Sequence, residues 1–304
     1  MISYAPTVSF DYYYKHPQLS SDGLDDSKVA LLIENRPNPI LAPLMLHFIR
    51  VVPPEWRFRF MGSPESVEYI NRSVAIREHV AARKLDLTLI PSNMSTGSSE
   101  EISRFLTTLW LYETVLQPAE TLLVFQTDSI ICANSPRSIN DYLEYDWIGA
   151  PWNPKATWGG NGGLSLRRVS AIIDVLRRES RAFNSDPEDV WLASRLSERP
   201  DAKMANGAVS LTFSGEMYSG KPTRVKPSAA NTTEDYYIEG IDDWRDGFYE
   251  PLGYHTGARG TTLHGAIWGT PKLRKHIWDY CPEIKMTLGM DAAEYVTGDC
   301  NPTW

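Results

Sequence analysis

The chain has 304 residues, of which 42% are hydrophobic and 22% charged, as in a soluble globular protein with one large domain or two small ones. Its formal net charge of −8 argues against nucleic acid or an anionic membrane as a partner, and leaves room for one local basic cleft that binds a phosphate.

Residues 1–27 are polar and irregular, and they lack the charged and apolar regions of a signal peptide. No run of about 18 apolar residues occurs anywhere in the sequence, so we expect no membrane span. These features predict a cytoplasmic or otherwise intracellular protein. Cys132, Cys281 and Cys300 show no paired spacing, so we expect buried free thiols and neither a disulfide framework nor a zinc site.

Short apolar runs alternate with helix signals through the first half of the chain. The sequence predicts strands at 29–33, 57–61, 87–90 and 121–125, and helices at 38–50, 63–85 and 98–116. Such alternation is typical of a parallel sheet with helices on both faces, in which ligands bind beyond the carboxyl ends of the strands. No glycine-rich dinucleotide fingerprint or P-loop follows the first strand, which argues against NAD binding and ATP hydrolysis.

The second half is less regular. Strands are expected at 145–150 and 164–166, and helices after Val169 and at 186–196. Residues 219–247 are rich in Ser, Thr, Gly and Asp, which indicates a long surface loop, and we hypothesise that it is a lid over an acceptor.

Asp128 follows the fourth predicted strand directly, within Gln126-Thr127-Asp128. A carboxylate at this edge suits a hard divalent cation, which takes oxygen ligands and keeps positions for phosphate oxygens. The alternative is a turn aspartate that accepts hydrogen bonds from its own backbone.

A glycine-rich segment, Gly159-Gly160-Asn161-Gly162-Gly163, lets backbone N–H groups approach a ligand closely and allows positive φ. The alternative interpretation is a flexible loop or a bulge.

Glu188 and Asp189 begin a predicted helix, whose dipole favours ionised carboxylates and so keeps Asp189 ready to accept a proton. Plain helix capping is the alternative. His255, in Gly253-Tyr254-His255, is a candidate second metal ligand in competition with His264, although a lone histidine is usually structural.

The order of these segments resembles a known family. The strings LLVFQTDSIIC, YDWIGAPW, GGNGGLSLR, EDVW, PLGYH and YCPE are similar to mostly fungal proteins classed as a domain of unknown function related to glycosyltransferases. The resemblance covers residues 28–285. The same order is more distantly similar to fringe-type and core-1 galactosyltransferases, which have an Asp-x-Asp metal motif, a Gly-Gly-x-Gly segment, an acidic pair with the catalytic base and a late metal-binding histidine.

This resemblance implies a GT-A type α/β fold with a mostly parallel central sheet, as a single domain over 28–304 with a nucleotide-binding half (28–132) and an acceptor half (133–304). It implies that Asp128 takes the place of the last Asp of Asp-x-Asp and directly binds Mn²⁺ or Mg²⁺, with His255 as the late ligand. Gln126 stands where the first Asp is expected, so a neutral amide replaces one charge. Asp189, next to Glu188, becomes the catalytic base.

The expected donor is a UDP-sugar, and the expected reaction is inverting transfer to a hydroxyl of a glycan, protein or small molecule. The residues expected to bind the nucleotide sugar are Glu34, Arg36, Arg104, Gln126, Thr127, Asp128, Trp152, Gly160, Asn161, Gly162 and Gly163. Two alternatives stay open: a sugar- or nucleotide-binding pseudoenzyme of the same fold, and a glycoside hydrolase that uses Glu188 or Asp189 with another carboxylate.

Overall fold

The computed structural model describes residues 23–219, 248–258 and 260–289. Residues 1–22 of the predicted irregular segment and residues 220–247 of the predicted loop lie outside the described residues, as does Cys300. The irregular segment was predicted to reach residue 27, but the first strand already begins at Asp25.

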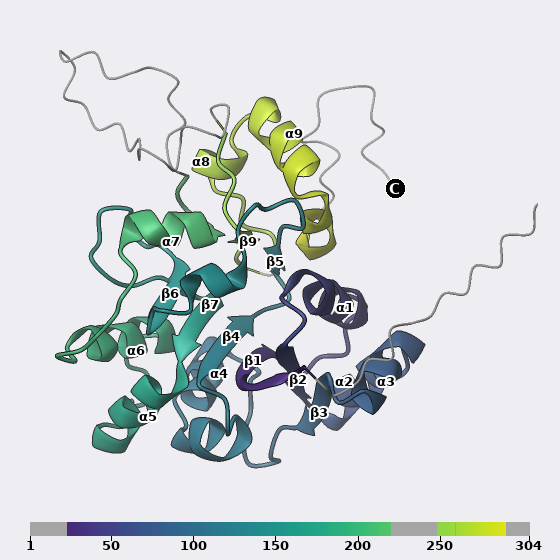
Figure 1. Cartoon of the computed structure of the whole chain (residues 1–304), viewed down its shortest axis with the longest axis vertical. Helices are drawn as coiled ribbons and strands as arrows, with labels where there is room; N and C mark the ends of the chain where they lie inside the picture. The colour runs from purple at the N-terminus through teal and green to yellow at the C-terminus, as the bar shows by residue number, and fades with distance from the viewer. Residues whose placement is uncertain (1–22, 220–247, 259, 290–304) are drawn as a thin grey trace, which may run out of the picture.

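A six-stranded mixed sheet forms the centre of the molecule, in the order β3-β2-β1-β4-β7-β6 (Figure 1). Its strands in chain order are β1 (Asp25–Ile33), β2 (Trp56–Gly62), β3 (Leu85–Leu89), β4 (Thr121–Phe125), β6 (Trp147–Ala150) and β7 (Asn161–Arg168). The neighbours β3, β2, β1 and β4 pair in parallel, whereas β7 runs antiparallel to both β4 and β6. This confirms the predicted α/β fold with a mostly parallel central sheet and flanking helices.

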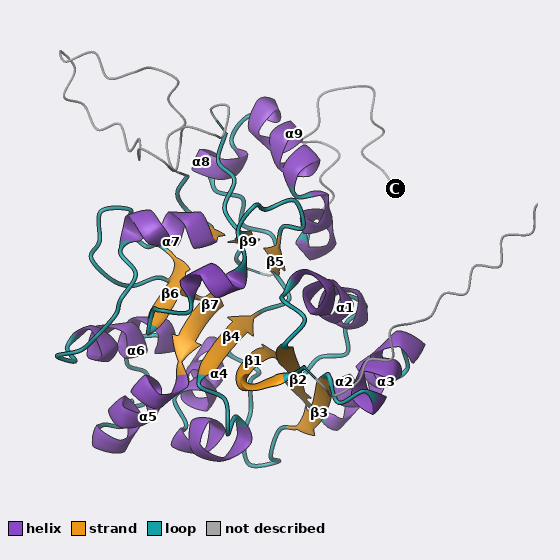
Figure 2. Cartoon of the chain, in the orientation of Figure 1, coloured by secondary structure: helices purple, strands orange, loops and turns teal. Residues whose placement is uncertain are grey.

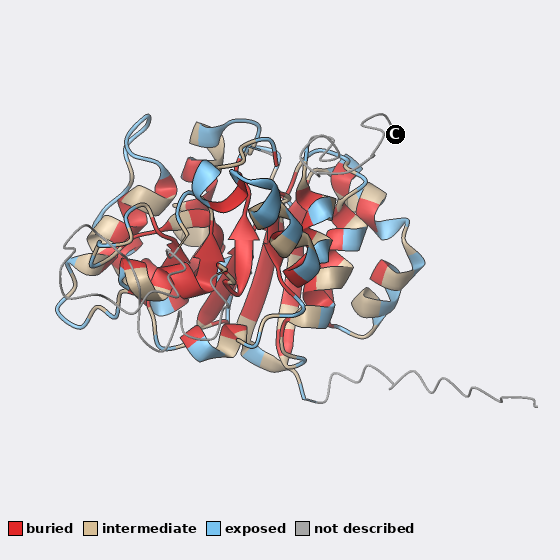
Figure 3. Cartoon of the chain, turned by 90° about the horizontal axis from the view of Figure 1, so that it is seen from above, coloured by how far each residue is buried: buried red, intermediate tan, exposed pale blue. Residues whose placement is uncertain are grey.

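Helices cover both faces of this sheet (Figure 2). They are α1 (Leu41–Val51), α2 (Pro64–Asn71), α3 (Val74–Ala81), α4 (Ser99–Leu106), η1 (Leu111–Val115), α5 (Val169–Arg178) and α6 (Glu188–Ser197). Successive strand side chains point to opposite faces, so Leu32 packs in the cluster with α1, α2 and α3, and Leu31 packs in the cluster with α4, η1, α5 and α6. Burial on both faces explains why the strands read as continuous apolar runs (Figure 3).

Two of the predicted helices are interrupted. The helix expected at 63–85 is two helices, because Ser73 accepts the backbone N–H of Ile76 and caps a new helix, α3. The helix expected at 98–116 ends at Leu106, where the hydroxyl of Thr107 donates to the carbonyl of Ser103, and the chain resumes in the π-helical turn η1.

A second, small sheet lies beside the central one and was not predicted. It consists of β5 (Ser129–Ile131), β8 (Ser214–Gly215) and β9 (Gly253–His255), in the order β5-β9-β8. Around it lie η2 (Ile139–Tyr142), α7 (Gly207–Phe213), α8 (Gly265–Trp268), α9 (Pro271–Tyr280) and η3 (Pro282–Thr287). Each of these strands has only two or three residues, too few to give a periodic pattern in the sequence.

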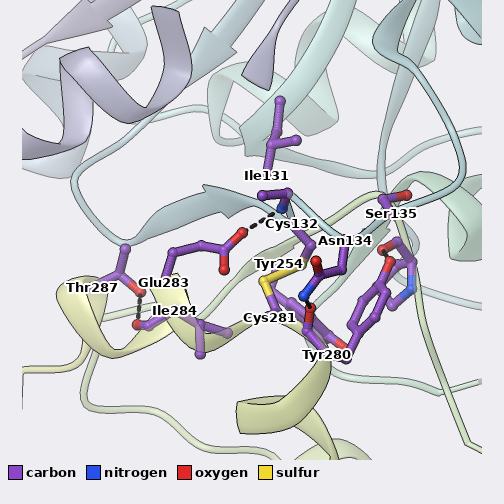
Figure 4. Close-up of a disulfide and its surroundings, with 12 residues drawn as sticks. Ile131, Cys132, Asn134, Ser135, Tyr254, Tyr280, Cys281, Glu283, Ile284 and Thr287 are labelled. Atoms are coloured by element: carbon purple, nitrogen blue, oxygen red, sulfur yellow. Dashed lines mark hydrogen bonds between the residues drawn. A yellow bond between two sulfur atoms is a disulfide. The ribbon is translucent and has the colours of Figure 1, made fainter. Parts of the chain in front are cut away.

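A disulfide joins Cys132, just after β5, to Cys281, just after α9 (Figure 4). The prediction of free thiols is therefore wrong for these two residues. They are 149 residues apart in sequence, and only the fold brings their Cα atoms to 4.9 Å. The backbone N–H of Ala133 also donates to the carboxylate of Glu283, which ties the same two segments together. Structural disulfides persist mainly in oxidising compartments, so this bond gives no support to an intracellular location. That location stays a prediction.

Within the described residues, every helix is too short or too polar to cross a lipid bilayer.

Candidate functional site

An open cleft of about 590 Å³ lies at the carboxyl ends of β1 and β4. Its lining includes Glu34, Arg36, Gln126, Thr127, Asp128, Asn161, Gly162, Gly163, Glu188, Asp189 and His255. Because β7 is antiparallel to β4, its first residues meet the last residues of β4, and the N–H of Gln126 donates to the carbonyl of Gly163 at 2.9 Å. The topology thus brings most of the predicted site residues to one edge of the sheet.

The two predicted metal ligands Asp128 and His255 lie next to one another in this cleft. Ser129 of β5 pairs with His255 of β9, and this register places the imidazole Nε2 3.4 Å from Oδ1 of Asp128. Both side chains are buried. The second predicted histidine, His264, precedes α8 and does not line the cleft.

Glu216, which the sequence did not single out, lies on the other edge of the His255 ring. Its Oε1 is 3.3 Å from Nδ1 of His255. Burial by itself lowers the pKa of His255, but the two carboxylates of Asp128 and Glu216 outweigh burial and raise it to about 9.

The donor set fits a divalent cation. Both ring nitrogens of His255 are buried, and neither has a hydrogen bond of good geometry, although a carboxylate lies near each. A carboxylate and an imidazole are metal-binding groups, and phosphate oxygens or water complete such a shell. In the described part of the chain, no three His, Cys, Asp or Glu side chains are grouped to hold a metal ion.

Gly162 and Gly163 allow the walls of the cleft to approach one another. A Cβ on Gly163 would lie 2.3 Å from Nε2 of His255, and one on Gly162 would lie 2.5 Å from Oε1 of Glu188. Neither residue has positive φ, so close approach and not backbone conformation requires glycine here. Gly159 and Gly160 do have positive φ, as expected from the glycine-rich sequence.

The neighbours Asp189 and Glu188 have different surroundings. Oδ2 of Asp189 accepts the backbone N–H of Gly162 at 2.9 Å, and its half-buried side chain faces the cleft. The carboxylate of Glu188 is buried against Arg167, whose two terminal nitrogens donate to it at 2.9 and 3.1 Å. Burial raises the pKa of Glu188, and the guanidinium of Arg167 opposes that shift.

Arg167 is completely buried and organises this wall of the cleft. It also donates to the carbonyl of Gly162 at 3.0 Å and to the hydroxyl of Ser165 at 2.9 Å, and it stacks on the ring of Trp147. One side chain therefore links the glycine segment to the start of α6. The sequence gives no signal for this role of Arg167, because an arginine beside an apolar run usually points to solvent.

Glu34 and Arg36 form an ion pair at the end of β1. Oε1 of Glu34 accepts both the backbone N–H and Nε of Arg36 at 2.8 Å. These hydrogen bonds raise the pKa of Arg36 against its partial burial, and the negative charge of Asp128 acts in the same direction. The guanidinium is half exposed and lines the cleft, so it remains accessible to an anionic ligand.

Three of the residues expected to bind the donor do not line this cleft. Arg104 is exposed and stacks over Phe183, at 5.8 Å from the ring centroid. Trp152 packs against Gly159, and the carbonyl of Gly160 accepts the indole N–H of Trp147.

The sequence and the structure were also compared with known proteins. Residues 84–229 match the model of a family described as "Protein of unknown function (DUF5672)". No curated protein matches the chain.

Several solved glycosyltransferase structures are partly similar to this fold. A mannosyltransferase from Pyrobaculum calidifontis, solved with GDP-Man and Mn²⁺, aligns over 60% of this chain and 55% of its own, with 12% identity and a TM-score of 0.41. The glycosyltransferase GlyE of Streptococcus pneumoniae aligns over 60% and 45%, with 11% identity and a TM-score of 0.40. The mannosyltransferase Ktr4p of S. cerevisiae aligns over 53% and 46%, with 9% identity and a TM-score of 0.32. The chain thus spans about half the length of these proteins. Support for a function therefore comes from the residues of the cleft and not from these likenesses.

Proposed function

We propose that this protein is a metal-dependent glycosyltransferase that moves a sugar from a nucleotide sugar, with a UDP-sugar as the expected donor, to an acceptor hydroxyl with inversion. One observation supports this most: Asp128 and His255 face one another in the same cleft as Asp189 and the Arg36 guanidinium. A cation site, an anion-accessible guanidinium and a carboxylate base are the parts that such a transfer needs.

Asp128 and His255 would hold Mn²⁺ or Mg²⁺, which supplies neutralisation of the charge that develops on the leaving diphosphate. Arg36 adds a positive charge on the same side of the cleft and orients the nucleotide portion together with Glu34. Because Gly162 and Gly163 carry no side chains, Glu188 and His255 can lie directly against them, which keeps the wall of the cleft next to the cation site.

Asp189 would act as the base that takes the proton from the acceptor hydroxyl as that oxygen attacks the anomeric carbon. Its carboxylate lines the cleft, where Oδ2 accepts the backbone N–H of Gly162 and Oδ1 accepts that of Val190. Both oxygens are therefore held in place by the backbone, and each keeps a lone pair that can take a proton from an acceptor. Glu188 instead holds Arg167 and supports the wall. That ion pair also counts against a glycoside hydrolase, which needs a second carboxyl group of its own at the bond that is cleaved.

Thermal shift with UDP, with and without Mn²⁺, tests donor binding, and UDP release from a panel of nucleotide sugars tests turnover. We expect a UDP- and Mn²⁺-dependent rise in Tm. We also expect the rate of UDP release to fall about 10²- to 10⁴-fold in Asp189→Asn, the range typical of a lost general base. Asp186→Asn is the matched control, because this exposed carboxylate precedes the same helix outside the cleft lining.

No rise in Tm with UDP under either condition contradicts nucleotide-sugar binding. A rise without release from any donor identifies a binding pseudoenzyme. Equal rates in wild type and Asp189→Asn contradict the assignment of the base.

A further inference from the structure

The imidazole of His255 lies between two carboxylates that approach different nitrogens. Oδ1 of Asp128 is 3.4 Å from Nε2, and Oε1 of Glu216 is 3.3 Å from Nδ1. The ring is buried, and Gly163 lies against it so closely that a Cβ there would overlap Nε2. The ring therefore has little freedom to turn.

Glu216 is itself held in place. It follows β8 directly, whose Gly215 pairs with Tyr254 next to His255. The side-chain amide of Asn161 donates to Oε1 of Glu216 at 3.4 Å, while its oxygen accepts the N–H of Gly163 at 2.7 Å. Because the Asn161 oxygen accepts the N–H of Gly163, its NH₂ group is the end of the amide that faces Glu216.

The two nitrogens of an imidazole diverge, so one group cannot contact both of them from one side. If Asp128 and Nε2 hold a cation, the ring proton is on Nδ1, which can donate it to Glu216. In metal sites this partnership of carboxylate and histidine fixes the tautomer and the orientation of the ligand, and its loss typically weakens metal binding 10- to 100-fold.

We propose that Glu216 is a positioning residue that holds His255 with Nε2 toward Asp128, and that Asn161 couples this arrangement to the glycine segment. The inference rests on the proposed function, because it deepens the same cation site. It gives roles to two side chains whose sequence contexts show no metal motif.

Titration of Mn²⁺ into the full chain in the presence of UDP, followed by calorimetry, measures the first consequence. We expect the Kd for Mn²⁺ to rise about 10- to 100-fold in Glu216→Ala and less in Glu216→Gln, whose amide oxygen can still accept the N–H. Glu250→Gln is the matched control: Glu250 contacts Nε2 of His276 at 2.5 Å in a pair outside the cleft lining.

Pulsed electron paramagnetic resonance of bound Mn²⁺ provides a readout that a purely structural role would not change. Wild type should show the ¹⁴N modulation of a coordinated imidazole, and His255→Ala should lose it. In Glu216→Ala the modulation should weaken, whereas in Glu250→Gln it should remain.

The outcomes separate the two proposals. If wild type binds no Mn²⁺ with UDP, the metal-dependent function and the role of Glu216 are both wrong. If wild type binds Mn²⁺ and Glu216→Ala binds it equally well, only the role of Glu216 is wrong. Weaker binding with an unchanged ¹⁴N modulation also overturns that role, because Glu216 would then act as a ligand itself or through the fold alone.

Discussion

Lys84 in the first half of the chain and Arg167 in the second half are both buried cations, but they have different partners. Nζ of Lys84 donates to the backbone carbonyls of Pro54 and Trp56, before β3 and far from the carboxyl ends of the strands. Arg167 binds the carboxylate of Glu188 and the carbonyl of Gly162, both of which line the cleft. Lys84 is therefore stabilised by backbone carbonyl dipoles at the edge of the sheet opposite the cleft. Arg167 is stabilised by the negative charge of Glu188 in the wall of the cleft.

Replacing Arg167 by Met is expected to have the largest effect on the free energy of unfolding. Glu188 then remains buried without its cation, and breaking a buried pair in this way typically costs about 3–5 kcal/mol of the free energy of unfolding. Urea unfolding at neutral pH measures the loss. The double variant Arg167→Met/Glu188→Met should recover most of it, because no charge is then left in the interior.

The exposed ion pair between Arg57 and Asp26 provides the control for this prediction. Both side chains are partly exposed, and such pairs contribute about 0–1 kcal/mol. Equal losses in Arg57→Met and Arg167→Met would contradict the special role given to the buried pair.

The disulfide allows a second test of how the two halves differ. The first half is held together by the pairing of strands in the central sheet. The small sheet that carries His255 is in addition tied to the end of α9, because Cys132 follows β5 and Cys281 follows α9. The double variant Cys132→Ser/Cys281→Ser should lose about 2–4 kcal/mol, as is typical when a long loop is no longer closed. Chemical unfolding measures this loss, and dithiothreitol should lower the Tm of wild type but not that of the double variant. An equal effect of dithiothreitol on both would show that the bond does not stabilise the fold.

The sequence predicts the central sheet of the first half better than it predicts the small sheet of the second half. The strands around Val29, Phe58, Leu87 and Leu122 were correctly placed, because buried parallel strands leave short apolar runs that a helix signal follows. Asp128 was placed at the end of such a strand by the same pattern. The small sheet and the disulfide pairing were missed, since neither leaves a local pattern.

The site shows a similar limit. The glycine segment and the acidic pair stand out in sequence, and the structure brings Gly162, Gly163, Glu188 and Asp189 to one cleft. Glu216 precedes a polar stretch without a motif, and only the pairing of β8 with β9 places it beside His255. Roles that depend on which side chains meet across strands therefore require the structure.

The smallest expected effect concerns Lys84 and sharpens the contrast with Arg167. Burial lowers the pKa of Lys84 to about 8, against about 10.5 in the unfolded chain. Between these pH values the unfolded chain binds more protons, so this lysine makes the free energy of unfolding rise with pH, by about 2–3 kcal/mol from pH 8 to 10.5. Lys84→Met should remove that part of the rise in urea unfolding at the two pH values. Arg167→Met should leave it in place, since a guanidinium stays charged throughout this range. Parallel pH curves for wild type and Lys84→Met would mean that the Lys84 ammonium is solvated and that the carbonyls of Pro54 and Trp56 do not enclose it.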